Sequence, residues 1–346
     1  MTIPHSAPTI SSVDHKSVSQ VLTTPYIAQG KKVQEFEEKF SRYLNVKGAV
    51  AVSSGTAALH LALLALGVKK GDEVIFPSYV CTALLNAVLY VGAVPCLVDV
   101  NEDDFNISFV DVKRKINRRT KAIIVPHIFG LPADLKPILK IGIPVIEDCA
   151  QSIGATYVGK KVGSWGQISI CSFYATKVMT TGEGGMISSN HQKYLDRAKN
   201  LRQYDHVSKF QMRFNYKLTD FQAALGLSQL KQLPQFIKKR QTMAQQYQKS
   251  FRNFGIVLPQ DFSGREHIFY RYVIRVKNSA KKEINILRRK GVDASAPVFK
   301  PMHAYLNKKG FPVSQKLFET SVSIPLYPSM SEQDIKKVIS VIRERL

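Results

Sequence analysis

The chain has 346 residues, 45% of them hydrophobic, which suits roughly two packed domains and makes a disordered chain improbable. Its 49 Lys and Arg residues against 26 Asp and Glu give a net charge of +23. A protein this basic can bind nucleic acid, a membrane surface or anionic small molecules. The basic residues are spread along the chain and form no basic arm, zinc finger or aromatic–basic RNA-binding strand, which argues against nucleic acid. Solvated helix faces and loops explain the charge most simply. Attraction of phosphorylated substrates, or of an anionic inner-membrane surface, is the second explanation.

The four cysteines form no C-x-x-C pair, and three of them lie in or beside apolar runs, as buried thiols in a reducing compartment do. The N-terminal residues contain no apolar core of signal-peptide length. No stretch reaches the roughly 18 apolar residues of a membrane helix. We therefore expect a cytoplasmic protein without an integral membrane segment.

The first half of the chain alternates between predicted helices and strands. Residues 1–30 carry scattered prolines and are expected to form an arm, and apolar residues at helical spacing begin at Val33. Helices are predicted over 55–67, which ends at a glycine, and over about 80–90. Short apolar runs predict strands at 49–54, 73–77, 94–100, 121–129, 143–148, 167–173 and 184–189.

These strands are continuous apolar runs, which is typical of a sheet covered by helices on both faces. Helical segments between several of them predict a mostly parallel mixed sheet with right-handed crossovers, an α/β fold. Binding sites in such sheets lie at the carboxyl ends of the strands.

The pattern changes after about residue 190, where helices become more frequent. The sequence predicts a helix over 191–204, two helices meeting near Pro234, a strand over 268–276 and further helices at 281–291 and 332–346. We predict an arm over 1–30, a large domain over 31–235 and a small C-terminal α+β domain over 236–346.

Two features follow the first predicted strands. Gly55 and Thr56 follow two serines where a strand passes into a helix, and free N–H groups with hydroxyls there can bind phosphate. An ordinary helix cap is the alternative. Tyr79 follows the next strand and is positioned to stack on a planar ligand or to pack in the core.

Two further features follow later strands. Asp148 ends a buried strand, where a carboxylate needs a partner such as a protonated ring nitrogen, with Gln151 three residues on; a helix cap is the alternative. Ser172 ends another strand, and Lys177 precedes the turn Gly182–Gly185. A desolvated lysine can hold an aldehyde as a Schiff base, whereas a solvated turn lysine is the ordinary interpretation.

Taken together, a phosphate cradle, a stacking ring, a carboxylate for a pyridine nitrogen and a lysine for an aldehyde are the groups that pyridoxal 5′-phosphate (PLP) requires. No metal site is indicated.

Long segments of the chain resemble the DegT/DnrJ/EryC1/StrS family of sugar aminotransferases, which have the fold-type I, aspartate aminotransferase-like architecture. The resemblance covers nearly the whole chain. It is carried by IAQGKKVQEFEEKF, AVSSGTAALHLALLALGVKKGDEVIFPS, EDCAQSIGATYVGKKVGSWGQISICSFYATKVMTTGEGGMI, FNYKLTDFQAALGLSQL and SIPLYPSMSEQD.

The resemblance implies a role for each matching residue. It makes Lys177 the catalytic lysine that carries the cofactor and moves the proton, and Asp148 the partner of the pyridine nitrogen. The remaining cofactor residues that it implies are Gln151 near the ring hydroxyl, Gly55, Thr56 and Ser172 at the phosphate, Tyr79 on the ring, and Asn215 reaching the cofactor of a second subunit. A homodimer with shared active sites is therefore expected.

The resemblance also implies the substrates. We expect an amino group to move, from glutamate, to the keto group of a nucleotide-linked deoxysugar for a surface polysaccharide such as lipopolysaccharide, or for a glycosylated natural product. His303 is a candidate substrate neighbour, with a surface-loop histidine as the alternative. Relatives that dehydrate sugars carry histidine at the lysine position, so Lys177 disfavours that reaction. A non-catalytic regulatory relative is a further alternative, but no DNA-binding segment is visible.

Overall fold

The computed structural model describes residues 2–205, 208 and 210–345 of the chain. The helices are α1 Ser12–Leu22, α2 Lys31–Leu44, α3 Gly55–Leu66, α4 Thr82–Tyr90, α5 Phe109–Lys115, α6 Leu135–Leu139, α7 Gln192–Arg202, α8 Asp220–Phe251, α9 Ala280–Arg289, α10 Met302–Tyr305, α11 Pro312–Thr320 and α12 Glu332–Arg345. The strands are β1 Gly48–Val52, β2 Glu73–Pro77, β3 Val94–Val98, β4 Thr120–Pro126, β5 Val145–Asp148, β6 Thr156–Tyr157, β7 Lys160–Lys161, β8 Ile168–Ser172, β9 Gly185–Ser189, β10 Tyr272–Arg275 and β11 Ser321–Ile324. A 3-10 turn, η1, covers Ile128–Gly130.

A seven-stranded sheet forms the centre of the molecule, with the strand order β1-β9-β8-β5-β4-β2-β3. Its neighbouring strands pair in parallel except at β9, which runs antiparallel to both β1 and β8. The predicted mostly parallel mixed sheet of an α/β fold is therefore confirmed. The carboxyl ends of β1, β5 and β8 meet along one edge, as predicted for parallel strands.

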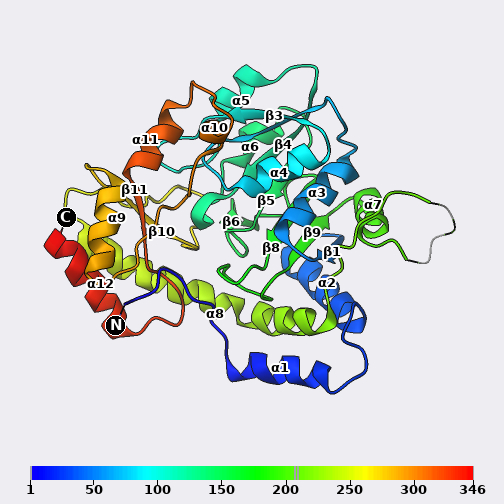
Figure 1. Cartoon of the computed structure of the whole chain (residues 1–346), viewed down its shortest axis with the longest axis horizontal. Coiled ribbons are helices and arrows are strands. Elements are labelled where there is room, and N and C mark those ends of the chain that lie inside the picture. The colour runs from blue at the N-terminus through cyan, green and yellow to red at the C-terminus, as the bar shows by residue number, and fades with distance from the viewer. Residues whose placement is uncertain (1, 206–207, 209, 346) are drawn as a thin grey trace.

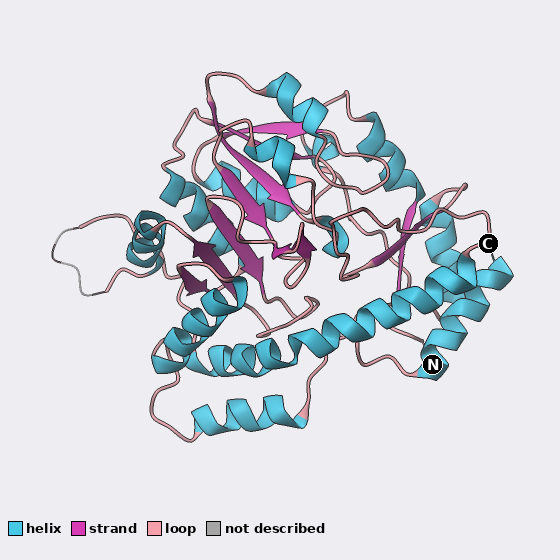
Figure 2. Ribbon diagram, turned by 180° about the vertical axis from the view of Figure 1, so that it is seen from behind, coloured by secondary structure: helices cyan, strands magenta, loops and turns pink. Residues whose placement is uncertain are grey.

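Helices cover both faces of this sheet (Figures 1 and 2). Because successive side chains of a strand point to opposite faces, Val50 and Val52 pack with α3 and α4, whereas Ala49 and Ala51 pack with α2 and α8. Burial on both faces is the reason that the strands read as continuous apolar runs rather than alternating ones.

A smaller unit surrounds the antiparallel pair β10–β11, with α9 and α12 packed against it and the C-terminal half of α8 beside it (Figure 1). The N-terminal residues belong to its core. Ile3 is buried there, and its N–H donates to the carbonyl of Gly291 at 2.9 Å. The predicted arm thus lies over the smaller unit, and it also contains α1, a helix not predicted, which lies along α8 (Figure 1).

The prediction of two helices meeting near Pro234 is wrong, because α8 runs without interruption from Asp220 to Phe251 with Pro234 inside it. A proline removes one helical hydrogen bond. Burial of Leu233 and Phe236 on either side keeps the helix packed through that defect. The division between residues 235 and 236 falls inside α8 and stays a prediction. None of the described helices is long and apolar enough to cross a membrane.

Candidate active site

The predicted phosphate cradle lies where β1 and β8 end. Gly55 opens α3, and the hydroxyl of Ser54 caps this helix by accepting from the N–H of Ala57 at 3.1 Å. A Cβ atom on Gly55 would lie 2.7 Å from Cβ of Ser172, so only glycine allows this approach. Gly55, Thr56 and Ser172 therefore meet beside the N-terminus of a 12-residue helix, where free N–H groups favour an anion.

Asp148 ends β5 and is buried on the same edge of the sheet. Its Oδ1 accepts from the N–H of Ala150 at 2.9 Å, and among the described residues this is the hydrogen bond recorded for the carboxylate. Burial raises the pKa of Asp148, although the N–H of Ala150 and the charge of Lys177 oppose the shift. A buried carboxylate of this kind is suited to a cationic partner that the polypeptide itself does not supply.

Lys177 follows β8 in a turn, in which its N–H donates to the carbonyl of Tyr174 at 2.9 Å. Its Nζ lies 5.2 Å from the centre of the Tyr270 ring. Burial raises the pKa of Tyr270, but the positive charges of Lys177, Arg271 and Arg240, with a hydrogen bond from Thr176, lower it to about 8. Tyr270 is not among the residues predicted for the site, because nothing in the run IFYRYVIRV marks one residue as facing the lysine.

One end of the Gln151 side-chain amide is already hydrogen-bonded within the protein. Its Oε1 accepts from the N–H of Phe129 at 2.8 Å, which leaves the amide NH2 as the group available to a ligand oxygen. Phe129 has a φ of 57°, a left-handed conformation that is unusual outside glycine, so this hydrogen bond helps to hold a strained turn beside the site.

The structure corrects the prediction for Tyr79. This side chain is fully buried, its hydroxyl donates to the carbonyl of Leu317 at 3.4 Å, and its ring packs against Phe105. Without an exposed face it cannot stack on a cofactor. Cys81, two residues later, is exposed and interacts electrostatically with both Lys177 and Asp148. The turn after β2 therefore directs Cys81, not Tyr79, towards the site.

The structure also corrects both interpretations of His303, which is neither a substrate neighbour nor a surface-loop residue. It is buried, its Nδ1 is paired with Oγ of Ser78 at 2.8 Å, and its Nε2 with Oε1 of Gln315 at 3.1 Å. Both ring nitrogens are thus occupied. The side chain joins the segment after β2 to α10 and α11, a structural role.

Asn215 is exposed, and no contact with the site residues of the same chain is recorded for it. The neighbouring N–H groups of Phe214 and Tyr216 donate to the carbonyls of Leu201 and Arg202, so this segment lies along the end of α7. A role towards a second subunit stays a prediction.

A second polar cluster lies next to Asp148 in the packed interior. His127, Glu147 and Cys149 hold their ligand-type atoms within 4.8 Å of one another and are all buried. Nδ1 of His127 accepts from the N–H of Ala133, so the proton on Nε2 points to Glu147 at 3.2 Å. Glu147 also accepts from the N–H groups of Gly163, Trp165 and Gly166. These bonds account for the cluster without a metal ion.

The site residues fit pyridoxal phosphate on the observations of this structure. A helix N-terminus next to a glycine–serine contact suits the phosphate, the buried carboxylate of Asp148 suits a protonated ring nitrogen, and Lys177 lies near that carboxylate. Fold and site together fit a PLP-dependent enzyme.

The comparisons with known proteins identify the family. Residues 8–343 match the model of the DegT/DnrJ/EryC1/StrS aminotransferase family. GDP-perosamine synthase of Escherichia coli O157:H7 is 35% identical over 99% of this chain and 98% of its own length. The spore coat polysaccharide biosynthesis protein SpsC of Bacillus subtilis is 32% identical over 99% and 96%. The chain belongs to the DegT/DnrJ/EryC1/StrS aminotransferase family.

Solved structures agree with this assignment. Spr1654 of Streptococcus pneumoniae in its PLP form has a TM-score of 0.94 and 26% identity, covering 99% of this chain and 98% of its own, and it is also known in a PMP form. Helicobacter pylori PseC, an aminotransferase of pseudoaminic acid biosynthesis, has a TM-score of 0.94 at 25% identity, covering 99% of both chains. The expected PLP-dependent aminotransferase is therefore confirmed.

Proposed function

We propose that this enzyme transfers an amino group from glutamate to a keto group of a nucleotide-linked deoxysugar, and that the product enters a surface polysaccharide. The observation that carries the proposal is Lys177 beside Asp148, next to a phosphate cradle, in a chain 35% identical to a GDP-perosamine synthase.

Each site residue has a defined task in this reaction. When bound, pyridoxal phosphate supplies an aldehyde that takes up the donor's amino group and a ring that accepts electrons. Asp148 holds the ring nitrogen in its protonated form by charge pairing. The α3 N-terminus with Gly55, Thr56 and Ser172 binds the phosphate, and the NH2 of Gln151 donates to the ring oxygen. Nζ of Lys177 removes and returns the proton at the reacting carbon.

We also propose that the working form is a cytoplasmic homodimer. Large apolar side chains are exposed on α8, on the segment after α1 and on the segment before Asn215, which is more apolar surface than isolated positions explain. They are Phe221, Tyr26, Ile27, Phe210 and Met212. In this dimer we propose that Asn215, which lies in the same segment as Phe210 and Met212, reaches the partner's phosphate cradle.

A panel of nucleotide-linked keto-sugars with ¹⁵N-labelled glutamate tests the proposed reaction. We expect one or more sugars to gain a labelled amino group, read as a mass increase, and Lys177→Ala to lose at least about a thousandfold in rate because the proton carrier is gone. Absence of labelled product across GDP-, UDP- and dTDP-linked sugars would refute the proposal. Retained transfer in Lys177→Ala would refute the role of the lysine.

A further inference from the structure

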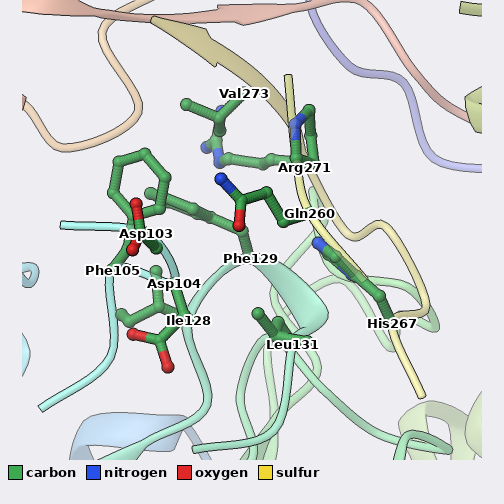
Figure 3. Close-up of a pocket in the computed structure, with 11 residues that line it drawn as sticks. Asp103, Asp104, Phe105, Ile128, Phe129, Leu131, Gln260, His267, Arg271 and Val273 are labelled. Carbon is green, nitrogen blue, oxygen red and sulfur yellow. The ribbon is translucent and has the colours of Figure 1, made fainter. Parts of the chain in front are cut away.

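The cavity in Figure 3 lies between the large sheet and the smaller unit, and its charged residues have partners within the protein. Asp104 pairs with Arg265 at 2.6 Å, and Nη1 of Arg271 lies 3.0 and 3.2 Å from the two ring nitrogens of His5. The cavity volume of about 20 Å³ holds about one water. The charges on this side of the sheet are therefore accommodated internally.

The opposite edge of the sheet, where β2, β3 and β4 begin, carries exposed cations. Lys69 and Lys70 lie in the segment before β2, Arg118 lies in the segment before β4, and Lys121 lies on β4 itself. All four are exposed. Within the described part of the chain, none of the four belongs to an ion pair, so their charges face solvent without a partner.

Backbone hydrogen bonds bring these segments together. The N–H of Glu73 donates to the carbonyl of Arg119 at 2.8 Å, and the N–H of Gly71 donates to that of Gly92 at 3.2 Å. A Cβ atom on Gly92 would lie 3.2 Å from Cβ of Lys70, so this lysine stands directly beside the segment before β3. Because β2 lies between β4 and β3, the four cations gather along one edge.

An irregularity in the sheet adds Lys121 to this edge. Glu73 pairs with Thr120 and Val74 pairs with Ala122, so Lys121 has no partner residue on β2. An extra residue of this kind redirects its side chain out of the regular pleat. Lys121 is exposed, whereas the following residues of β4 are buried.

The carboxylates of these segments leave the cations in excess. The segments contain two of them, Asp72 and Glu73. Glu73 is buried, pairs with Arg119 and accepts from Nδ2 of Asn117 at 2.6 Å. Asp72 is partly exposed, and its Oδ2 accepts from the N–H of Lys69 at 2.9 Å. The exposed charge at this edge is therefore strongly positive.

Exposed apolar side chains stand beside the cations. Leu89 and Tyr90, at the end of α4, are 50% and 59% exposed. The N–H of Gly92 donates to the carbonyl of Leu89 at 2.9 Å, which holds this turn next to Lys70. Cations that surround an aromatic and an aliphatic side chain suit the headgroup layer of an anionic bilayer, where lipid phosphates meet hydrocarbon.

We call Lys69, Lys70, Leu89, Tyr90, Arg118 and Lys121 the amino-edge patch. It lies on the far side of the sheet from the active site, because the parallel strands in Figure 2 point towards the smaller unit. A five-residue strand such as β2 spans about 16 Å at about 3.3 Å per residue. A surface bound at this patch therefore leaves the carboxyl edge, with its cofactor residues, open to substrates.

We propose that the amino-edge patch docks the enzyme reversibly on an anionic bilayer surface. The four cations face the lipid phosphates, and Leu89 and Tyr90 enter the headgroup layer. This role goes beyond the aminotransferase reaction and does not depend on it. A lipid surface fits the patch better than nucleic acid does, because the chain shows no groove-reading element and because apolar side chains stand among the cations.

Flotation with vesicles tests this assignment. The PLP-loaded enzyme is mixed with vesicles of phosphatidylcholine alone, or of phosphatidylcholine with phosphatidylglycerol, and the bound fraction is measured against lipid concentration. Wild type should float with the phosphatidylglycerol vesicles and not with the neutral ones. A several-fold rise in salt concentration should release it, because screening shortens the reach of the charges.

Two variants separate the contributions of charge and apolar contact. Replacement of all four patch cations by glutamine should raise the lipid concentration for half-maximal binding at least about 100-fold. The double variant Leu89→Ser with Tyr90→Ser should raise it at least about tenfold and keep the salt dependence of wild type.

The matched control removes four exposed cations from α8 and α9, by glutamine replacement of Lys238, Lys239, Lys281 and Lys282. It has the same net charge as the patch variant and should bind vesicles within about twofold of wild type, because charges beyond a Debye length contribute little. All variants should keep the absorbance of the bound cofactor, because the patch lies far from the site.

Equal weakening in the patch variant and the matched control would reduce the effect to overall charge and overturn the assignment. Absence of wild-type binding to phosphatidylglycerol vesicles, or equal binding to neutral ones, would also overturn it. Tighter binding of wild type to RNA than to vesicles, lost in the patch variant, would assign the patch to nucleic acid instead. Loss of bound cofactor in the patch variant would show that these cations support the fold and would count against a docking role.

Discussion

Glu147 and Asp148 are adjacent carboxylates at the end of β5, and they occupy opposite environments. Glu147 points into the packed interior, where it accepts hydrogen bonds from three backbone N–H groups and His127. Asp148 points to the sheet edge, where the recorded hydrogen bond comes from one N–H group. A fully bonded buried charge is part of the fold, whereas an incompletely bonded one marks a place for a ligand.

The pKa values follow the same division. Burial raises the pKa of Glu147, but the hydrogen bonds from His127, Gly163 and Gly166 outweigh it and hold the pKa below its usual value. For Asp148 burial prevails, and the pKa is raised. Strand alternation explains the difference, because successive side chains of β5 point to opposite faces of the sheet.

The largest expected effect is on stability, from Glu147→Gln. A glutamine presents an NH2 group to N–H donors and leaves one of them unbonded in the interior, so we expect a loss of about 3 kcal/mol in the free energy of unfolding. Urea denaturation of the cofactor-free protein measures it. Glu102→Gln is the control, because its pairs with Arg275 and Lys316 are near the surface and should be worth less than about 1 kcal/mol. An equal loss of unfolding free energy in the two variants would show that the buried Glu147 stabilises the fold no more than the near-surface Glu102 does.

Asp148→Asn should change stability in the opposite direction to Glu147→Gln. Removal of a buried, incompletely bonded charge should stabilise the cofactor-free protein by about 1 kcal/mol at pH 7 and weaken cofactor binding at least about tenfold. Because the folded pKa is raised, the wild-type group contributes fully to stability below its unfolded pKa of about 4. That contribution is lost as the pH rises through the folded pKa, so the gain of Asp148→Asn should shrink in acid. A variant less stable than wild type at pH 7 would contradict this account.

The smallest expected effect concerns Cys81, which neighbours Asp148, the incompletely bonded carboxylate. Its thiol should react with iodoacetamide in the cofactor-free protein and be protected at least about tenfold by bound pyridoxal phosphate, because Lys177 and Asp148 are its neighbours. Peptide mass spectrometry follows the alkylation. Cys96, half-buried at the far edge of the sheet on β3, is the internal control and should show no protection. Equal labelling of Cys81 with and without cofactor would place it outside the site.

Much of the site was predictable because strand ends are visible in sequence. Gly55, Asp148 and Ser172 each stand where an apolar run stops, and parallel strands bring such ends to one edge. The prediction that Tyr79 stacks on the cofactor was wrong for a local reason. Its turn after β2 directs side chains two residues apart in different directions, and no period identifies the one that faces the ligand. The predictions for His303 were wrong because a histidine in a loop-rich segment gives no sign that Ser78 and Gln315 will occupy both of its ring nitrogens.

By itself, the sequence determined the fold class and the cofactor class and singled out the lysine proposed to serve it, because apolar periodicity and strand-end chemistry are local properties of the chain. Only the tertiary structure decided that His5, Thr176, Tyr270 and Arg271 meet. These residues come from the arm, the turn after β8 and the segment just before β10, and their approach depends on the packing of the smaller unit against the large sheet. The finding that Cys81, not Tyr79, faces the site has the same origin. The packing of a turn, not its composition, decides which side chain is buried.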